Sequence, residues 1–160
     1  MKRVSILRSF WGIVALMAGV SMAHADSVPS ANPFLQYSDP DGIVAAVQTN
    51  FETEAGQSVR LTVYDSEDNF LEMATMKHRG VLDENGLAVV RFLGLEPGDY
   101  AFAAYLDENG DGRLNRGALG IPKEPIAFSN GIIPKLRRPA FSETKVDVAA
   151  GSVVVITLED

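Results

Sequence analysis

One short acidic segment carries the residues best suited to chemistry. Asp107, Asn109 and Asp111 stand at every second position, and Gly112 follows them. In a tight loop with this spacing alternate side chains turn inward, and their oxygens are the ligands that calcium prefers. The backbone carbonyl of Arg113 would add another oxygen. The sequence therefore predicts a calcium site formed by Asp107, Asn109, Asp111 and Arg113.

The match with a helix–loop–helix calcium site stops partway. Position twelve of that pattern is a bidentate Glu, but here it is Ala118, and no helical pattern flanks the loop. A later carboxylate such as Glu124, or water, would have to complete the ligand set. The alternative is a solvated turn, because Asp, Asn and Gly are also common turn residues. If calcium binds, we expect the weak affinity of extracellular sites.

The long segment that follows, residues 116–131, is a second candidate site. It mixes apolar and polar side chains, and long loops either cover the edge of a core or bind something. One interpretation is a compact loop that closes one end of the fold. The sharper prediction is a pocket ringed by polar groups with an aromatic floor. The predicted ligand-binding residues are Lys123, Glu124, Phe128, Ser129 and Asn130.

A basic run follows that segment. Lys135, Arg137 and Arg138 lie close together in a chain with an excess of acidic residues. Such a run could meet a lipid phosphate or a carboxylate of a partner, and it could equally be a solvated loop before Pro139.

The N-terminus has the pattern of a secretory signal peptide. Lys2, Arg3 and Arg8 precede an apolar run over residues 10–20, and Ala23-His24-Ala25 fits an A-x-A cleavage site. The apolar run is short for a membrane span. We therefore expect residues 1–25 to be removed after Ala25, leaving a periplasmic or secreted protein with no transmembrane span.

The mature chain should comprise an extended Pro/Ser-rich tether, residues 26–42, and one domain, residues 43–160. Short β-like runs with Gly, Pro and Asn between them fill the domain, and no helical periodicity competes with them. The predicted strands are residues 43–49, 58–64, 70–76, 87–93, 100–106, 144–148 and 152–158. This spacing predicts an all-β fold: an antiparallel Greek-key β-sandwich of about seven strands, immunoglobulin-like or prealbumin-like. The last two strands should form a terminal hairpin.

Charge and composition exclude several classes of function. Without residues 1–25 the basic count falls from 14 to 11 against 21 acidic residues, so the net charge is 11 − 21 = −10. Such a chain should repel nucleic acid. The chain has no Cys, and His78 is the one His beyond the signal peptide. Thiol nucleophiles and His-rich zinc sites are therefore excluded, and we expect no Ser-His-Asp triad.

Five sequence pieces in this order resemble a known bacterial family. They are residues 98–101, 107–112, 119–124, 128–130 and 139–141. Together they resemble the bacterial exported domain-of-unknown-function family 2141, over about residues 43–158. The resemblance implies an exported all-β domain and no established activity. Members often carry a His before the first Asp of the loop; Leu106 stands there, so no role of that His applies here. A looser likeness is to transthyretin-like and carboxypeptidase-regulatory-like modules.

These observations favour a non-catalytic binding or interaction module of the cell envelope. It would recognise a small molecule, a glycan or an envelope protein, and calcium would order its loop. One alternative is a small hydrolase in which Asp107, Asp111 and Glu124 supply a carboxylate acid and base. Another is a structural subunit of an envelope assembly. No catalytic constellation is recognised in the sequence.

Overall fold

The computed structural model describes residues 32–135 and 137–160. The predicted signal peptide and the first part of the predicted tether lie outside the described residues. The strands are β1 (Ile43–Thr49), β2 (Ser58–Tyr64), β3 (Met76–Val81), β4 (Leu87–Phe92), β5 (Gly98–Asp107), β6 (Ile126–Phe128), β7 (Lys145–Val148) and β8 (Val153–Leu158). The short helices are η1 (Pro33–Tyr37), η2 (Ala118–Gly120), η3 (Ser129–Gly131) and α1 (Phe141–Thr144). No helix in the described part of the chain is long and apolar enough to cross a membrane.

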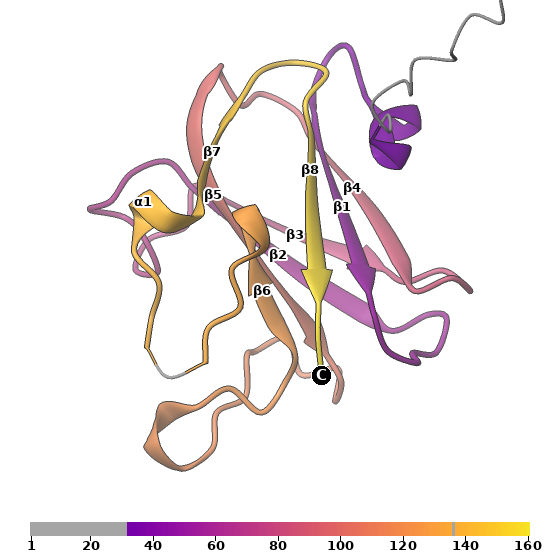
Figure 1. The fold of residues 1–160 in the computed structure, drawn as a ribbon, viewed down its shortest axis with the longest axis vertical. Helices are drawn as coiled ribbons and strands as arrows, with labels where there is room; N and C mark the ends of the chain where they lie inside the picture. The colour runs from indigo at the N-terminus through magenta and orange to yellow at the C-terminus, as the bar shows by residue number, and fades with distance from the viewer. Residues whose placement is uncertain (1–31, 136) are drawn as a thin grey trace, which may run out of the picture. The chain divides into compact units, whose positions relative to one another are not determined.

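The strands form two sheets that face each other (Figure 1). The smaller sheet has the order β4-β1-β8. The larger sheet has the order β3-β2-β5, and β5 then pairs with β6 along one part of its free edge and with β7 along another. The predicted all-β sandwich is confirmed. β6 is a strand that sequence analysis had placed within a loop.

The hydrophobic core lies between the two sheets. Alternate residues of a strand point to opposite faces, so every second residue of β2 and β5 faces inward. Val59, Leu61 and Val63 of β2 are buried there, as are Phe102 and Leu106 of β5. Leu106, which precedes the first Asp of the acidic loop, is thus a core residue. Within β2, the buried Val59, Leu61 and Val63 alternate with the partly exposed Arg60 and Thr62.

The third predicted strand is wrong. The strand lies at Met76–Val81, whereas residues 70–75 form a turn in which Leu71 has a φ of +62°. Phe70 explains the shift, because its ring packs against Tyr64 on the outer face of the larger sheet, with ring centroids 5.3 Å apart. β3 itself is an edge strand with three consecutive charged or polar exposed residues, which discourages pairing with another chain.

The predicted terminal hairpin is also wrong. β7 pairs with β5 in the larger sheet, and β8 crosses to the smaller sheet and pairs with β1. The β1–β8 pair is parallel, which departs from a wholly antiparallel arrangement. The short connection at residues 149–151 therefore joins two layers. Local sequence indicates a turn there, but it does not say which strands lie beside each other.

The second part of the predicted tether is folded. Pro33–Tyr37 forms η1, which contacts β1 and β8. Asp39 is buried and accepts a hydrogen bond from Arg91 Nε of β4 at 2.6 Å. The backbone N–H of Asp41 and the Arg91 guanidinium hold the pKa of Asp39 below its usual value. Residues 33–42 thus belong to the folded domain.

Removing the Phe102 side chain tests this core. Phe102 is fully buried, and its ring meets Phe92 of the opposite sheet edge-on at 5.7 Å. Phe102→Ala should lower the free energy of unfolding by about 3–5 kcal/mol in urea melts. Val89→Ala, at an exposed position of β4, is the control and should change it by less than about 1 kcal/mol. Equal effects of the two substitutions would contradict the sandwich core.

Candidate functional site

A pocket lies on the outer face of the larger sheet, on the side away from the main core. Its volume is about 430 Å³. The floor is made by outward-facing side chains of three neighbouring strands, which the two-residue repeat of each strand brings together. These floor residues are Thr62 and Tyr64 of β2, Ala103 and Tyr105 of β5, and Ile126 and Phe128 of β6.

Two loops form the walls of this pocket. The first wall, residues 114–122, includes η2, and its apolar side chains Leu119 and Ile121 are exposed to solvent at 96% and 47%. Leu119 also has a φ of +64°, a conformation that costs a non-glycine residue energy and that clusters at functional sites. The second wall is formed by residues 134–135 and 137–139. Exposed apolar groups beside a hollow are typical of a binding surface.

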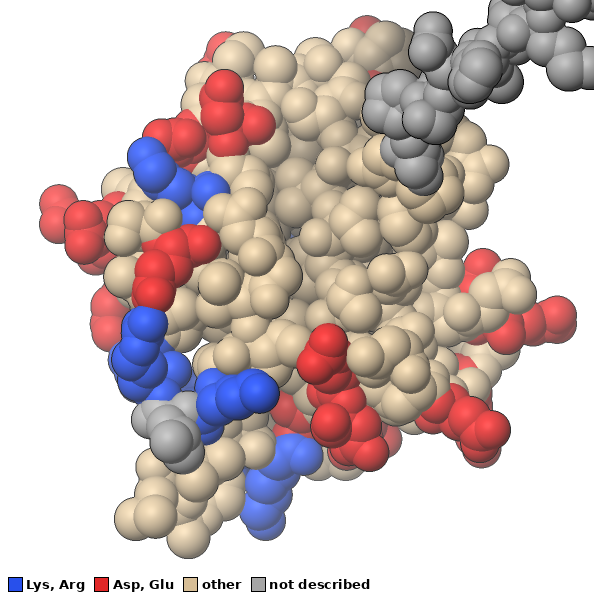
Figure 2. All heavy atoms as spheres, viewed as in Figure 1, with Lys and Arg blue, Asp and Glu red and all other residues tan. Residues whose placement is uncertain are grey.

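Four basic side chains line the same pocket. They are Arg116, Lys135, Arg137 and Arg138. Figure 2 shows Lys and Arg side chains gathering near the loops on either side of β6, while acidic side chains lie around much of the rest of the molecule's outline. Arg116 and Lys135 form no ion pair with any residue that the structure describes. A positive site therefore stands out on a chain with a net charge of −7.

The second wall is held by an ion pair with α1. Arg137 meets both carboxylate oxygens of Glu143, at 2.8 and 2.6 Å, and Glu143 also accepts the N–H of Ala140 at 2.7 Å. These contacts, led by Arg137, lower the pKa of Glu143 to about 2. Glu143 therefore stays ionised at any physiological pH. Arg137 is paired with Glu143, and Arg138 lies 3.7 Å from a Glu72 carboxylate oxygen. Arg116 and Lys135 are therefore the pocket cations that form no ion pair with the described residues.

Two tyrosines give the floor polar tips. Burial raises the pKa of Tyr64 and of Tyr105, and the Asp107 carboxylate raises that of Tyr105 further. Both phenols are therefore neutral hydrogen-bond donors over the physiological range. The floor thus combines aromatic surface with two hydroxyl groups.

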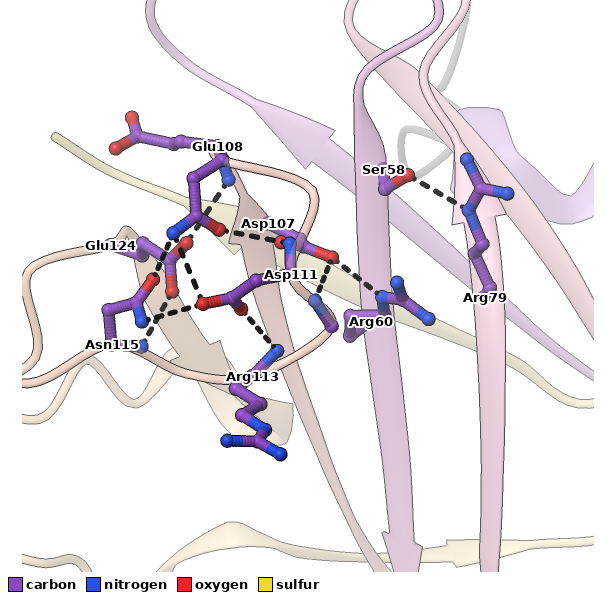
Figure 3. A network of polar contacts seen from close by, with 11 residues as sticks. Ser58, Arg60, Arg79, Asp107, Glu108, Asp111, Arg113, Asn115 and Glu124 are labelled. Atoms are coloured by element: carbon purple, nitrogen blue, oxygen red, sulfur yellow. Dashed lines mark hydrogen bonds and ion pairs between the residues drawn. The ribbon is translucent and has the colours of Figure 1, made fainter.

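The predicted calcium loop lies at the end of β5 and leads into the first wall (Figure 3). Its side chains bond to one another and to the backbone. Asn109 Oδ1 accepts the N–H of Asp111 at 3.1 Å, and Asp111 Oδ1 accepts the N–H of Arg113 at 2.8 Å. The Asn115 side-chain amide donates to Asp111 Oδ2 at 3.0 Å. The Asn115 amide and the Arg113 N–H hold the pKa of Asp111 below its usual value.

The Glu124 side chain accepts hydrogen bonds from both ends of this loop. Its carboxylate is buried and accepts the N–H of Glu108 at 3.2 Å and the N–H of Asn115 at 2.8 Å. Asp107 is also buried, and its Oδ2 bonds to Arg60 Nε of β2 at 2.9 Å. The four predicted metal-binding residues therefore lie in one ordered loop. In residues 32–135 and 137–160, no group of three or more His, Cys, Asp or Glu side chains has an arrangement that could hold a metal.

The five predicted ligand-binding residues are not brought together. Phe128 lies in the floor of the pocket, whereas Lys123 and Glu124 line a second, shallower hollow near the C-terminus. Ser129 and Asn130 lie on the side of β7 and α1. The Asn130 amide donates to the carbonyl of Lys145 at 2.8 Å.

Ser129 has a structural position inside the sheet. Its hydroxyl accepts the N–H of Phe102 at 2.9 Å and donates to the carbonyl of Thr144. Phe102 is the residue at which β5 changes partner, because residues 98–101 pair with β7 and residues 103–105 pair with β6. The Ser129 side chain fills this gap in the ladder.

Several residues of the pocket floor were missed by sequence analysis. Thr62, Tyr64 and Tyr105 sit at ordinary outward positions of strands, and nothing local distinguishes them from solvent-facing residues. Two signals were available. Residues 116–131 were predicted to form a pocket with an aromatic floor, and they contribute Phe128 and part of the first wall. Lys135, together with its basic neighbours, was recognised as a spot that could meet a phosphate or carboxylate. What the sequence could not show is that this run lies over an aromatic floor.

The comparison with protein families gives a clear result. Residues 47–156 match the model of a family described as an uncharacterized protein conserved in bacteria (DUF2141). The chain belongs to this family, and the resemblance seen in the sequence is confirmed. The matched residues span both sheets, from within β1 to within β8, together with the pocket and the acidic loop.

Comparisons with curated proteins and with solved structures identify no further relationship. No curated protein matches the chain. Among solved structures, the chain is similar to the crystal structure of the major plantain pollen allergen Pla l 1, at 12% sequence identity and a TM-score of 0.37, with 74% of this chain and 93% of that chain covered. A likeness of this size carries no argument.

The bridge made by Ser129 can be tested by removing its hydroxyl. Ser129→Ala leaves the buried Phe102 N–H and Thr144 carbonyl without this partner, so the free energy of unfolding should fall by about 1–3 kcal/mol. Ser142→Ala, at an exposed position of α1, is the matched control and should have almost no effect. A stability loss for Ser142→Ala equal to that for Ser129→Ala would show that the bridge does not hold the sheet together.

Proposed function

We propose that this protein is an exported, non-catalytic binding module of the bacterial cell envelope whose pocket takes a small amphipathic anion. The ligand would place an apolar body over the floor and an acidic group against Arg116 and Lys135. A fatty acid or an aromatic carboxylate has this chemistry.

One observation carries the proposal: an apolar pocket with cations at its rim on an otherwise acidic protein. Ligand sites combine mostly apolar lining with a few polar groups that fix orientation. Here Phe128, Ile126 and Leu119 supply apolar surface, and Arg116 and Lys135 supply positive charge. A neutral or cationic ligand would leave those charges unused, so charge complementarity favours an anion.

The alternative of a carboxylate-dependent hydrolase gains no support from Glu124. A general acid or base must reach a substrate, whereas both oxygens of Glu124 accept backbone N–H groups inside the loop. Asp107 is likewise buried and bonded to Arg60. These contacts suit groups that maintain a fold, and they favour binding over hydrolysis.

Export is the part of the proposal that rests on the N-terminal sequence. The chain should be cleaved after Ala25, so intact-mass measurement of protein recovered from a bacterial periplasmic or secreted fraction should give a first residue of Asp26. Recovery of a cytoplasmic chain that retains residues 1–25 would contradict export. It would not affect the proposal for the pocket ligand.

The ligand class can be tested with two probes that differ in their head group. The full chain, expressed in a bacterial host and purified as the cell delivers it, should bind dodecanoate and should not bind dodecyltrimethylammonium, measured by calorimetry below the micellar range. Arg116→Glu and Lys135→Glu should each weaken dodecanoate binding on the order of tenfold, because a charged contact is replaced by repulsion.

Lys123→Glu is the matched control. Lys123 is a cation on the same segment of chain, but it lines the hollow near the C-terminus and not this pocket. Its substitution should leave the affinity within about twofold. Loss of binding in Lys123→Glu with normal binding in Arg116→Glu would move the site to the hollow near the C-terminus. Equal binding of both probes would overturn the proposed ligand class.

A further inference from the structure

We propose that the loop after β5 is a weak calcium site. Its protein ligands are side-chain oxygens of Asp107, Asn109 and Asp111 and the carbonyl oxygen of Arg113. This site is separate from the pocket, and it does not depend on the ligand proposed there.

The observation that points to an ion is a buried carboxylate oxygen with no partner. The Asp107 side chain is fully buried. Its Oδ2 accepts the N–H of Gly112 at 3.0 Å and the Nε–H of Arg60 at 2.9 Å, but Oδ1 meets no hydrogen-bond donor among the described residues. A buried, unsatisfied acceptor is costly, and a bound ion is one of the ordinary reasons for one.

The Asp107 carboxylate lies beside the loop that would hold the ion, because its Oδ2 accepts the N–H of Gly112. Figure 3 shows Asp107 between Arg60 on one side and Asp111 on the other. Arg60 and the N–H of Gly112 both bond to Oδ2, so Oδ1 is the oxygen of this buried carboxylate that is left for an ion. Asn109 Oδ1 and Asp111 Oδ1 each accept one backbone N–H, which leaves each of them a further lone pair.

The chain contains its own comparison for this loop. Residues 83–86 and residues 107–110 have the same sequence, Asp-Glu-Asn-Gly. In the first copy, Asp83 is exposed, and its Oδ1 accepts the N–H groups of Asn85 and Leu87 at 2.8 and 2.9 Å, as in an ordinary turn. In the second copy, Asp107 is buried with a free oxygen. The same four residues are therefore a closed turn in one place and an open ligand set in the other.

The composition of the site sets its affinity and its choice of ion. Only two of its four protein ligands carry charge, and Arg60 already neutralises part of Asp107. We therefore expect a dissociation constant on the order of 10⁻⁴–10⁻³ M, the range of extracellular modules. Mg²⁺ demands a smaller and stricter octahedral shell, so an irregular loop of this kind should prefer Ca²⁺.

The experiment is an NMR titration of the full, chelator-treated chain with CaCl₂ to about 10 mM, at constant ionic strength maintained with NaCl. Saturable amide shifts should be concentrated in residues 107–115. Asp111→Asn keeps an acceptor for the N–H of Arg113 but removes the charge, so calcium affinity should fall at least about tenfold. Asp111 is exposed, and this variant should remain folded.

Asp83→Asn is the control, since it removes the same charge from the copy of the sequence that forms a closed turn. Its calcium affinity should stay within about twofold of the parent chain. Three results would each overturn the proposal: no saturable shift, equal effects of Asp83→Asn and Asp111→Asn, or equal response to MgCl₂. The first would mean that Oδ1 of Asp107 meets water only, and the second that calcium merely screens an acidic surface.

Discussion

Strand β5 is the constraint on which the rest of this molecule depends. It pairs with β2 along one edge and with β7 and then β6 along the other. A change of partner within one strand leaves backbone groups unpaired, and in a buried sheet such groups are costly. The Ser129 hydroxyl satisfies them at Phe102. Because β5 changes partner here, β6 can pair with it and place Phe128 beside Ala103. The acidic loop begins where β5 ends.

The two faces of the larger sheet have different roles. The inner face closes the main core against the smaller sheet. The outer face carries a second apolar cluster that includes Tyr64 and Phe128, with Phe70 and Phe141 packed upon it. This cluster covers only part of the face, and the uncovered part is the pocket. Packing of Phe70 on this outer-face cluster thus explains why residues 70–75 do not continue as a strand. It also explains why a hollow remains on the uncovered part of the face.

The acidic loop and the pocket share one segment of chain. Glu124 anchors the loop by accepting the N–H groups of Glu108 and Asn115, and the chain then continues directly to Arg116 in the pocket wall. In this chain, the oxygen-rich spacing is thus combined with a basic, apolar hollow in the same domain. The same long strand, β5, positions both the acidic loop and part of the pocket floor.

The sequence by itself determined the elements whose pattern is local. The bounds of β1 and β2 follow from runs of β-forming residues and from the two-residue repeat, and the acidic loop follows from the spacing of Asp107, Asn109 and Asp111. Tertiary structure alone decided that β8 pairs in parallel with β1 and that the Ser129 hydroxyl bonds to the backbone of β5 where that strand changes partner. It also decided that the basic run lies beside an aromatic pocket floor. The reason is physical: periodicity says which residues share a face, but pairing between distant strands determines which faces meet.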